Sequence, residues 1–407
     1  MKTGSIAAAL FLLAAPAFAD DTIKIAYIDP LSGGGALVGE VGLKHFHYLA
    51  DQINAAGGLN GKTIEIVAFD GKANPQESLI QAQKAADQGA RIITQGAGSS
   101  VAAALSSWVT KYNERNPGKE IVYLNYGAID PALTNDKCAY WHFRFDAHTD
   151  IKMAAMTTFM KDRSSIKKVY LINQDYSYGQ SVQRDARAML KEKRPDIEIV
   201  GDELHPLFKV TDFSPYIAKI KASGADSVIT GNWGQDFALL LKAAAGAGLQ
   251  TDWYTTYAGL IGGPTTVRQT GLSHRVFVAS VYAPNTAPAE AQAMDADFRG
   301  KSGTALLPPY VNEMRVLAKA ITDAKADDAK SIAAQLEGLK LPSYEGGELV
   351  MRSDDHQVFQ NMFIASFGPL DPGAKFDEEG TGWGWKTIGS VNGADTVVST
   401  TCKMERP

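Results

Sequence analysis

Cysteine is scarce in this chain of 407 residues, which contains only Cys138 and Cys402. Two cysteines without a neighbouring histidine pattern do not supply the four ligands of a structural zinc site. In an oxidising compartment the two thiols would form one disulfide, which would tie the C-terminal tail to the first half of the chain. The sequence leaves a pair of free thiols as the alternative.

Positive charge is also in short supply. The chain carries 40 lysine and arginine residues against 45 acidic ones, and its formal net charge is −5. No stretch forms a basic stripe, which is the usual electrostatic footprint of a protein that binds nucleic acid. The composition therefore argues against a nucleic-acid partner.

Only one long hydrophobic run is present, and it lies at the N-terminus. It extends from Ile6 to Ala15, follows the single charge of Lys2, and precedes the small-x-small sequence Ala17-Phe18-Ala19. This pattern predicts a signal peptide of residues 1–19, cleaved after Ala19, because the run is too short for a resident membrane span. No cysteine near the cleavage site offers a lipid anchor. We expect an exported protein, located in the periplasm if the source has two membranes.

Catalytic and metal-binding motifs are missing. The seven histidines form no His-Glu-x-x-His pair, and His45 and His47 would point to different sides of a helix. The segment Gly96-Ala97-Gly98 lacks the third glycine of a dinucleotide fingerprint, and no Walker lysine or Gly-x-Ser-x-Gly elbow occurs. Asp70 and Asp175 fit solvated loop acids better than a catalytic pair. The chain is predicted to be a non-enzyme that needs no metal and no cofactor.

What the sequence does contain is a regular alternation of β-rich and helix-favouring segments. This alternation occurs twice, predicting two α/β units with parallel sheets covered by helices on both faces. The chain is also longer than one core normally supports. The predicted strands are 22–28, 62–69, 91–94, 121–125, 169–173, 197–203, 227–230, 252–256 and a returning strand after Arg275; the predicted helices are 36–56, 76–88, 100–113, 179–191, 213–222, 235–245, 290–298, 311–324 and 329–337.

The loop from Gly96 to Ser100 is the clearest candidate for a binding element. It joins the predicted strand at 91–94 to an alanine-rich helix, so several free backbone N–H groups would point at one spot. Such a spot suits an anion, most simply a ligand carboxylate, and Ser99 and Ser100 could add hydroxyl donors. The alternative is an ordinary capped turn between a strand and a helix.

Several segments of the sequence resemble a known family. They are Asp29 to Gly39 (DPLSGGGALVG), Ile53 to Asp70 (INAAGGLNGKTIEIVAFD), Gln95 to Leu105 (QGAGSSVAAAL), Tyr126 to Thr134 (YGAIDPALT) and Asp175 to Ser181 (DYSYGQS). Together they are similar to the periplasmic leucine/isoleucine/valine-binding protein family. This family comprises the type I solute-binding proteins of branched-chain amino acid-type ABC importers.

The resemblance implies an α/β fold of two Rossmann-like lobes joined by a three-crossover hinge that closes on a small molecule. Lobe 1 would comprise 20–147 plus about 280–352, and lobe 2 148–279 plus about 353–368. Crossovers are expected near 145–149, 278–283 and 350–354, with the tail 369–407 tied to lobe 1. The implied partners are a small-molecule solute and the membrane permease subunits of an ABC importer, and we expect a monomer.

The resemblance also implies a set of ligand-binding residues. In the family, the loops after the third and fourth strands hold a ligand carboxylate, and lobe 2 adds aromatic side chains. Tyr126, Tyr257 and Tyr310 are further aromatic wall residues of this chain. The full predicted set is Gly98, Ser99, Ser100, Tyr126, Gly127, Ala128, Ile129, Tyr178, Asn232, Trp233, Tyr257 and Tyr310.

The sequence departs from the amino-acid binders of the family in ways that bear on the ligand. The loop Tyr257-Ala258-Gly259 lacks the acidic residue that pairs with a ligand ammonium, and Ile129 stands where a threonine is expected. A buried ammonium without a counter-charge is costly, although Asp175 or Asp236 could supply one. With its aromatic walls, the cleft is expected to favour a small organic carboxylate, aromatic acids included.

Other interpretations stay open. The chain could bind a branched-chain amino acid or an amide, or act as a soluble ligand sensor that partners a membrane receptor. A receptor ectodomain is disfavoured because the chain has neither a later membrane-spanning run nor a signalling module. Arg144 is expected to be structural rather than ligand-binding. The run from Trp383 to Lys386 is expected to pack on the lobes as a small apolar cluster.

Overall fold

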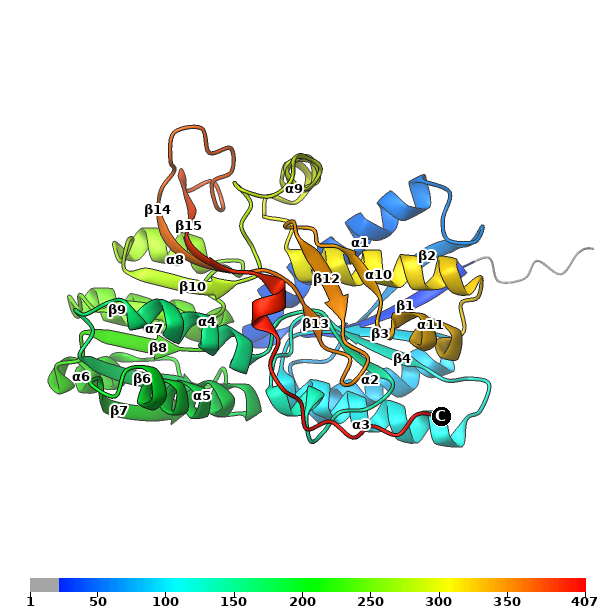
Figure 1. Ribbon diagram of the computed structural model, residues 1–407, viewed down its shortest axis with the longest axis horizontal. Helices are drawn as coiled ribbons and strands as arrows, with labels where there is room; N and C mark the ends of the chain where they lie inside the picture. Colours follow the sequence, from blue (N-terminus) through cyan, green and yellow to red (C-terminus); the bar gives the residue numbers. More distant parts are fainter. Residues whose placement is uncertain (1–21) are drawn as a thin grey trace, which may run out of the picture.

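The structure is a computed structural model that describes residues 22–407. The predicted signal peptide and its cleavage after Ala19 lie outside the described residues. The chain forms two α/β lobes side by side, each built on its own sheet (Figure 1). This is the predicted fold class.

Lobe 1 contains a parallel sheet of five strands in the order β2-β1-β3-β4-β5. Helix α1 packs beside α10 on one side of this sheet, and α2 packs beside α3 on the other (Figure 1). The elements are β1 (Thr22–Asp29), α1 (Ala36–Ala55), β2 (Thr63–Asp70), α2 (Pro75–Asp87), β3 (Ile92–Gln95), α3 (Ser99–Arg115), β4 (Val122–Asn125), β5 (His142–Arg144), α9 (Ala289–Ser302), α10 (Pro308–Ala324) and α11 (Ala329–Leu336), with short 3-10 turns η1 (Gly33–Gly35) and η2 (Pro131–Thr134).

Lobe 2 contains a sheet of seven strands in the order β15-β14-β10-β9-β8-β6-β7. The strands from β10 to β7 are parallel, whereas β14 and β15 are antiparallel additions at one edge. The elements are α4 (Thr149–Lys161), β6 (Lys168–Gln174), α5 (Ser177–Lys193), β7 (Glu198–His205), α6 (Ser214–Ser223), β8 (Ser227–Thr230), α7 (Gly234–Gly246), β9 (Asp252–Thr255), α8 (Gly263–Thr270), β10 (Val276–Ser280), β14 (Met362–Pro369) and β15 (Trp383–Val391).

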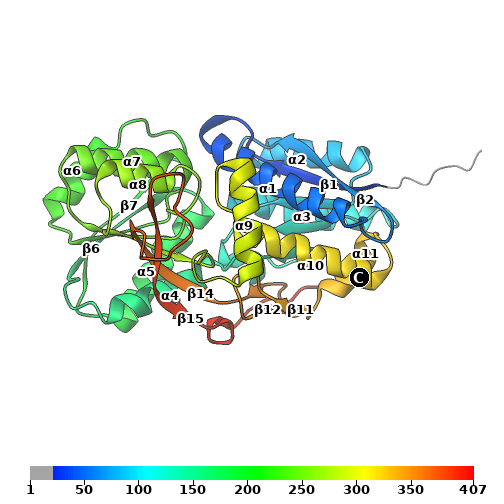
Figure 2. The ribbon, with the colours of Figure 1, turned by 90° about the horizontal axis from the view of Figure 1, so that it is seen from above.

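Before the C-terminal tail, the chain passes between the lobes at three places. It leaves lobe 1 after β5 and enters α4, and it returns after β10, where α9 stands at the lobe boundary (Figure 2). A small antiparallel sheet of β11 (Lys340–Pro342), β12 (Glu348–Met351) and β13 (Val358–Phe359) precedes the third passage. Because Val358 packs in the lobe 1 core, this passage lies between β13 and β14 and not at the expected 350–354.

The C-terminal tail belongs to both lobes. Its first part contains β15, which extends the lobe 2 sheet and buries Trp385 in the core. After the short turn η3 (Gly393–Thr396) the tail returns to lobe 1, where the Thr400 hydroxyl donates to the Thr134 carbonyl at 2.8 Å. The disulfide between Cys138 and Cys402 is present, as predicted. The tail therefore makes a fourth connection between the lobes, which the sequence did not predict.

Close contacts set the start of two helices. In α1, a Cβ on Gly39 would lie 1.8 Å from the carbonyl oxygen of Pro30, and in α5 a Cβ on Gly179 would lie 1.9 Å from that of Gln174. No side chain fits at such distances, so glycine allows each helix to begin directly against the loop that follows its strand. These two loops face the boundary between the lobes.

One apolar core fills lobe 1, and two cover the faces of the lobe 2 sheet. Val38, Ala97 and Ile129 of lobe 1 pack into one of the lobe 2 clusters, so the lobes are in contact. No helix within residues 22–407 combines the length and apolar character needed to cross a membrane. In that same range, no group of three His, Cys, Asp or Glu side chains is arranged to hold a metal ion.

Candidate functional site

A cavity lies between the lobes. It is formed by the loops that follow β3 and β4 in lobe 1 and β6, β8 and β9 in lobe 2, with the start of α10. Carboxyl ends of parallel strands are the usual location of ligands in open α/β sheets. The lining residues are Val38, Gly96, Ala97, Gly98, Ser99, Tyr126, Gly127, Asp146, Tyr176, Tyr178, Trp233, Tyr257, Leu260, Leu307, Pro309 and Tyr310.

The N-terminus of α3 contributes the polar end of the cavity. Gly98 caps the helix with φ +105°, a backbone conformation open mainly to glycine, and no side chain caps the first turn. The Ser99 hydroxyl accepts a hydrogen bond from the Asp130 N–H at 3.2 Å, which leaves its own proton free to donate. First-turn N–H groups and this hydroxyl together suit a carboxylate.

A buried carboxylate of the protein already accepts hydrogen bonds from part of the same loop. Asp29 accepts hydrogen bonds from the N–H groups of Ala97 (2.8 Å) and Gly96 (3.2 Å) and from the Tyr126 hydroxyl (2.5 Å). Burial raises the pKa of Asp29 to about 6, while these hydrogen bonds act in the opposite direction. Within the loop from Gly96 to Ser100, the N–H groups of Gly96 and Ala97 thus bind Asp29. The start of α3 is the part of the loop that suits an anionic ligand.

The loop after β4 is also held by internal hydrogen bonds. The Asn125 side-chain oxygen accepts from the N–H groups of Gly127 (3.1 Å) and Ala128 (2.7 Å). The Gly127 carbonyl accepts from the Tyr257 hydroxyl of lobe 2 at 2.6 Å. Two of the three residues of this loop that the resemblance assigned to a ligand, Gly127 and Ala128, therefore have their N–H groups engaged within the loop.

Aromatic rings form the remaining walls. On the lobe 1 side, Tyr126 and Tyr310 lie with ring centroids 4.3 Å apart. On the lobe 2 side, Tyr178 lies 5.7 Å from both Tyr176 and Tyr257, and the Trp233 indole N–H donates to the Tyr176 hydroxyl at 2.8 Å. Burial raises the pKa of Tyr257 well above its usual value, so its hydroxyl remains a proton donor.

One acidic side chain lines the cavity, and it is not one that the sequence pointed to. Asp146, at the first passage between the lobes, is 3% exposed. Its Oδ2 atom lies 2.8 Å from the Lys152 ammonium and 3.2 Å from the Tyr257 hydroxyl, and its Oδ1 accepts from the Ala147 N–H. The cavity therefore contains a carboxylate that is already neutralised by a buried lysine.

Eight of the twelve predicted ligand-binding residues line the cavity, namely Gly98, Ser99, Tyr126, Gly127, Tyr178, Trp233, Tyr257 and Tyr310. The other four do not. Ser100 lies one position further into α3, and Ala128 and Ile129 are buried behind the loop. Asn232 is fully buried because its side chain pairs with His205. Sequence reasoning missed Val38, Asp146, Tyr176, Leu260, Leu307 and Pro309, whereas Gly96 and Ala97 belong to the candidate loop but not to the predicted set.

The two acids suggested as counter-charges lie elsewhere. Asp175 is exposed and accepts from Gln180, whereas Asp236 is buried and accepts from Gln174 and from the Phe208 N–H. Neither lines the cavity. Arg144 is fully buried and donates to the Asp130 carbonyl at 2.6 Å, so it braces the loop after β4 from behind.

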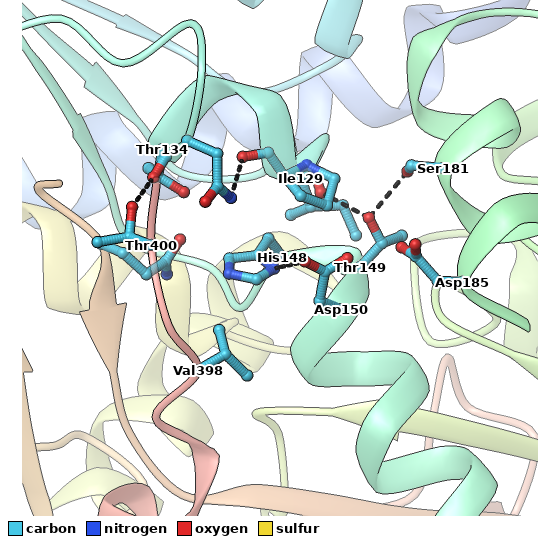
Figure 3. A network of polar contacts seen from close by, with 12 residues as sticks. Ile129, Thr134, His148, Thr149, Asp150, Ser181, Asp185, Val398 and Thr400 are labelled. Atoms are coloured by element: carbon cyan, nitrogen blue, oxygen red, sulfur yellow. Dashed lines mark hydrogen bonds and ion pairs between the residues drawn. The ribbon is translucent and has the colours of Figure 1, made fainter. Parts of the chain in front are cut away.

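Polar contacts join the lobes at the start of α4 (Figure 3). The Thr149 hydroxyl contacts the Ile129 carbonyl of lobe 1 at 3.1 Å and the Ser181 hydroxyl of lobe 2 at 2.8 Å (Figure 3). Burial lowers the pKa of the adjacent His148 well below its usual value. The ring is therefore neutral, and its 4.0 Å approach to Asp150 is not an ion pair at neutral pH.

Comparison with known proteins gives the same architecture. A family model described as periplasmic binding protein matches residues 22–370. Leu/Ile/Val-binding protein homolog 4 of Brucella abortus is 33% identical, with coverage of 100% of this chain and 98% of the relative. The crystal structure of a leucine-, isoleucine-, valine-, threonine- and alanine-binding protein from Brucella ovis, in a closed conformation, is 33% identical with a TM-score of 0.82 and covers 95% of this chain and 99% of that one.

More distant structures share the fold. A solute-binding protein of an ABC transporter from Rhodopseudomonas palustris BisB5, in complex with 3,4-dihydroxybenzoic acid, is 18% identical with a TM-score of 0.76 and covers 92% of this chain and 98% of its own. Two α/β lobes around an interlobe cavity define a two-lobed solute-binding protein. The chain belongs to the periplasmic binding protein family, and it is homologous to the branched-chain amino acid binders of ABC transporters.

Proposed function

We propose that this protein is the solute-binding component of a branched-chain amino acid-type ABC importer and that it binds a small organic carboxylate, with aromatic acids as the first candidates. The proposed ligand-binding residues are the eight predicted residues that line the cavity, together with Tyr176. The open protein would capture the solute on lobe 1, and lobe 2 would then close over it. Closure requires that the solute bind the closed state better than the open one.

The observation that carries the proposal is the charge distribution around the cavity. Its polar end combines the start of α3 with the Ser99 hydroxyl, both of which favour an anion. The one acid in its lining, Asp146, is paired with Lys152. An α-amino acid would bring a buried ammonium to a site without an unpaired anion, whereas a carboxylate without an ammonium avoids that cost.

The aromatic walls support the same ligand class. Tyr176, Tyr178, Trp233 and Tyr257 approach from lobe 2, and flat rings provide apolar area with defined stacking geometry. Distant structures of this fold hold 3,4-dihydroxybenzoic acid, benzoate or 4-hydroxybenzoate, so the fold itself accommodates aromatic acids.

A branched-chain or other small amino acid is the second candidate. The relatives with 33% identity carry names that refer to leucine, isoleucine and valine. Asp146 is the observation that favours this candidate, since its carboxylate could meet a ligand ammonium if Lys152 moved away. A short amide is a less favourable variant because most of the lining is aromatic or apolar.

The cellular setting is part of the proposal. Residues 1–19 would direct export and be cleaved after Ala19, and the closed protein would deliver its solute, as a monomer, to membrane permease subunits. A soluble sensor that reports ligand occupancy to a membrane receptor is the alternative role. Binding to the permease of the importer, and not to a receptor, would distinguish the two.

A thermal-shift screen of residues 20–407 tests the ligand class. The panel contains aromatic carboxylates, aliphatic monocarboxylates, dicarboxylates, leucine, valine and short amides. Ligand at a hundredfold excess over its dissociation constant stabilises the folded state by about 2.7 kcal/mol, which gives a clear rise in melting temperature. A rise with carboxylates and none with amino acids supports the proposal. A rise with leucine or valine alone replaces it with the second candidate.

A further inference from the structure

A second chamber adjoins the cavity on the far side of Tyr257. It shares Asp146, Tyr257, Leu260, Leu307 and Pro309 with the first. The rest of its wall comes from the hinge side of the cleft and consists of Lys152, Thr256, Gly259, Val278, Ser280, Val281, Tyr282 and Pro308. The two chambers are thus adjacent and share a wall that includes Tyr257.

Lys152 is the charged group of this second chamber. Its side chain is 2% exposed, and its ammonium lies 2.8 Å from Asp146 Oδ2 and 4.5 Å from the centre of the Tyr257 ring. An ammonium has three N–H donors, and the hydrogen bond to Asp146 uses one of them. A buried lysine whose ammonium can donate further hydrogen bonds is unusual in the lining of an apolar chamber, because a buried donor without an acceptor is costly.

The partners of Asp146 limit what can bind beside it. The carboxylate accepts from Lys152, from the Tyr257 hydroxyl and from the Ala147 N–H, so its oxygens are engaged. The pair carries no net charge. A second carboxylate from a ligand would therefore add an uncompensated negative charge, whereas a neutral oxygen would satisfy the lysine without that cost.

On the basis of the proposed function, we propose that Lys152 determines specificity for organic acids that carry a neutral hydrogen-bond acceptor at the end opposite the carboxylate. The carboxylate lies at Ser99 and the start of α3. A hydroxyl or carbonyl oxygen lies in the second chamber and accepts a hydrogen bond from Lys152. Tyr257 borders both chambers and contacts the middle of the ligand.

The test compares ligand pairs that differ only in the distal oxygen. Benzoate is paired with 4-hydroxybenzoate, and hexanoate with 6-hydroxyhexanoate; terephthalate represents a dicarboxylate. Dissociation constants are measured by calorimetry for the wild type and for Lys152→Met. Because this variant leaves Asp146 unpaired and could fail to fold, the neutral double variant Lys152→Met with Asp146→Asn is measured as well. Lys219→Met, an exposed lysine of lobe 2, is the control.

We expect the wild type and the control to prefer the hydroxylated member of at least one pair by tenfold or more, and to bind it more tightly than terephthalate. The preference should fall below threefold in whichever Lys152 variant folds. Equal affinity within both pairs, or a preference that survives removal of Lys152, would overturn this inference and leave the proposed function standing. If no carboxylate binds while an amino acid does, the proposed function itself fails, and the inference fails with it.

Discussion

The two walls of the cavity are built on different principles. In lobe 1, the polar loops are fixed by side chains of the protein, since Asp29 holds the loop before α3 and Asn125 holds the loop after β4. In lobe 2, the wall is a set of aromatic rings, in which the Trp233 indole N–H donates to the Tyr176 hydroxyl and the Tyr257 hydroxyl donates to the Gly127 carbonyl of lobe 1. The polar end of the site is thus held by hydrogen bonds within lobe 1, whereas lobe 2 supplies Tyr176, Tyr178, Trp233 and Tyr257 to the aromatic wall.

The largest expected effect concerns the lobe 1 wall. Asp29→Ala removes the acceptor for Gly96, Ala97 and Tyr126, leaving three buried donors without a partner. We expect a loss of about 3–5 kcal/mol of folding free energy, measured by urea unfolding.

Asp175→Ala is the matched control because this lobe 2 acid is exposed. Its expected effect is within about 0.5 kcal/mol. Similar losses in both variants would contradict the claim that an internal carboxylate organises the lobe 1 loop.

The next largest effect concerns the disulfide that helps to connect the two lobes. The disulfide between Cys138 and Cys402 links the lobe 1 surface to a tail that also contributes β15 to the lobe 2 sheet. Cross-links of this kind typically stabilise by about 2–4 kcal/mol. We expect Cys138→Ser with Cys402→Ser to lower the melting temperature in calorimetry. Reductant should lower that of the wild type to the same value, and it should leave the double variant unchanged.

A third prediction concerns a buried acid of lobe 2. Asp185 of α5 has its pKa raised to about 8, first by burial and then by the neighbouring Asp150. The stability that this group contributes is complete below about pH 4 and is lost as the pH rises through 8. One such proton accounts for up to about 1.4 kcal/mol per pH unit.

Asp185→Asn should therefore make the decline of stability between pH 6 and 9 shallower. Measuring the urea midpoint across this range tests the prediction, with Asp175→Asn as the control. An unchanged slope would show that Asp185 does not hold a proton in the folded protein.

The smallest expected effect concerns a single hydroxyl between the walls. Tyr257→Phe removes the hydrogen bonds to the Gly127 carbonyl and to Asp146 that hold the lobes together. We expect about a fivefold weaker affinity for the carboxylate found in the screen, or about 1 kcal/mol. Tyr216→Phe, outside the cavity, should change affinity by less than twofold. Equal effects would argue against a role for the Tyr257 hydroxyl in closure.

The sequence was sufficient for the alternating fold because its strands are short apolar runs bounded by turn residues. It did not predict α4, α8 or β5, and it did not predict the strand β15, where glycines alternate with tryptophans from Gly382 to Trp385. The sequence pattern within a segment predicts its structure poorly when that structure depends on pairing with distant parts of the chain.

The site was less predictable than the fold for the same reason. Asp146 lies at a passage between the lobes, just after the short strand β5 that the sequence did not predict, so its position gave no signal. Asp29 was visible in the matching motif, but its partners Gly96, Ala97 and Tyr126 are 67 to 97 residues away in the chain. By contrast, Tyr126 and Tyr257 directly follow predicted strands, and Tyr178 and Trp233 lie between a predicted strand and the next predicted helix.

The most direct test of the central claim is the affinity of the best carboxylate from the screen for Ser99→Ala and Ser100→Ala, measured by titration calorimetry. Ser99 lines the cavity and Ser100 does not, although both belong to the first turn of α3. The account predicts at least tenfold weaker binding for Ser99→Ala, about 1.5 kcal/mol for a hydrogen bond to a charged group, and little change for Ser100→Ala. Unchanged affinity in Ser99→Ala would contradict the placement of the carboxylate at the start of α3.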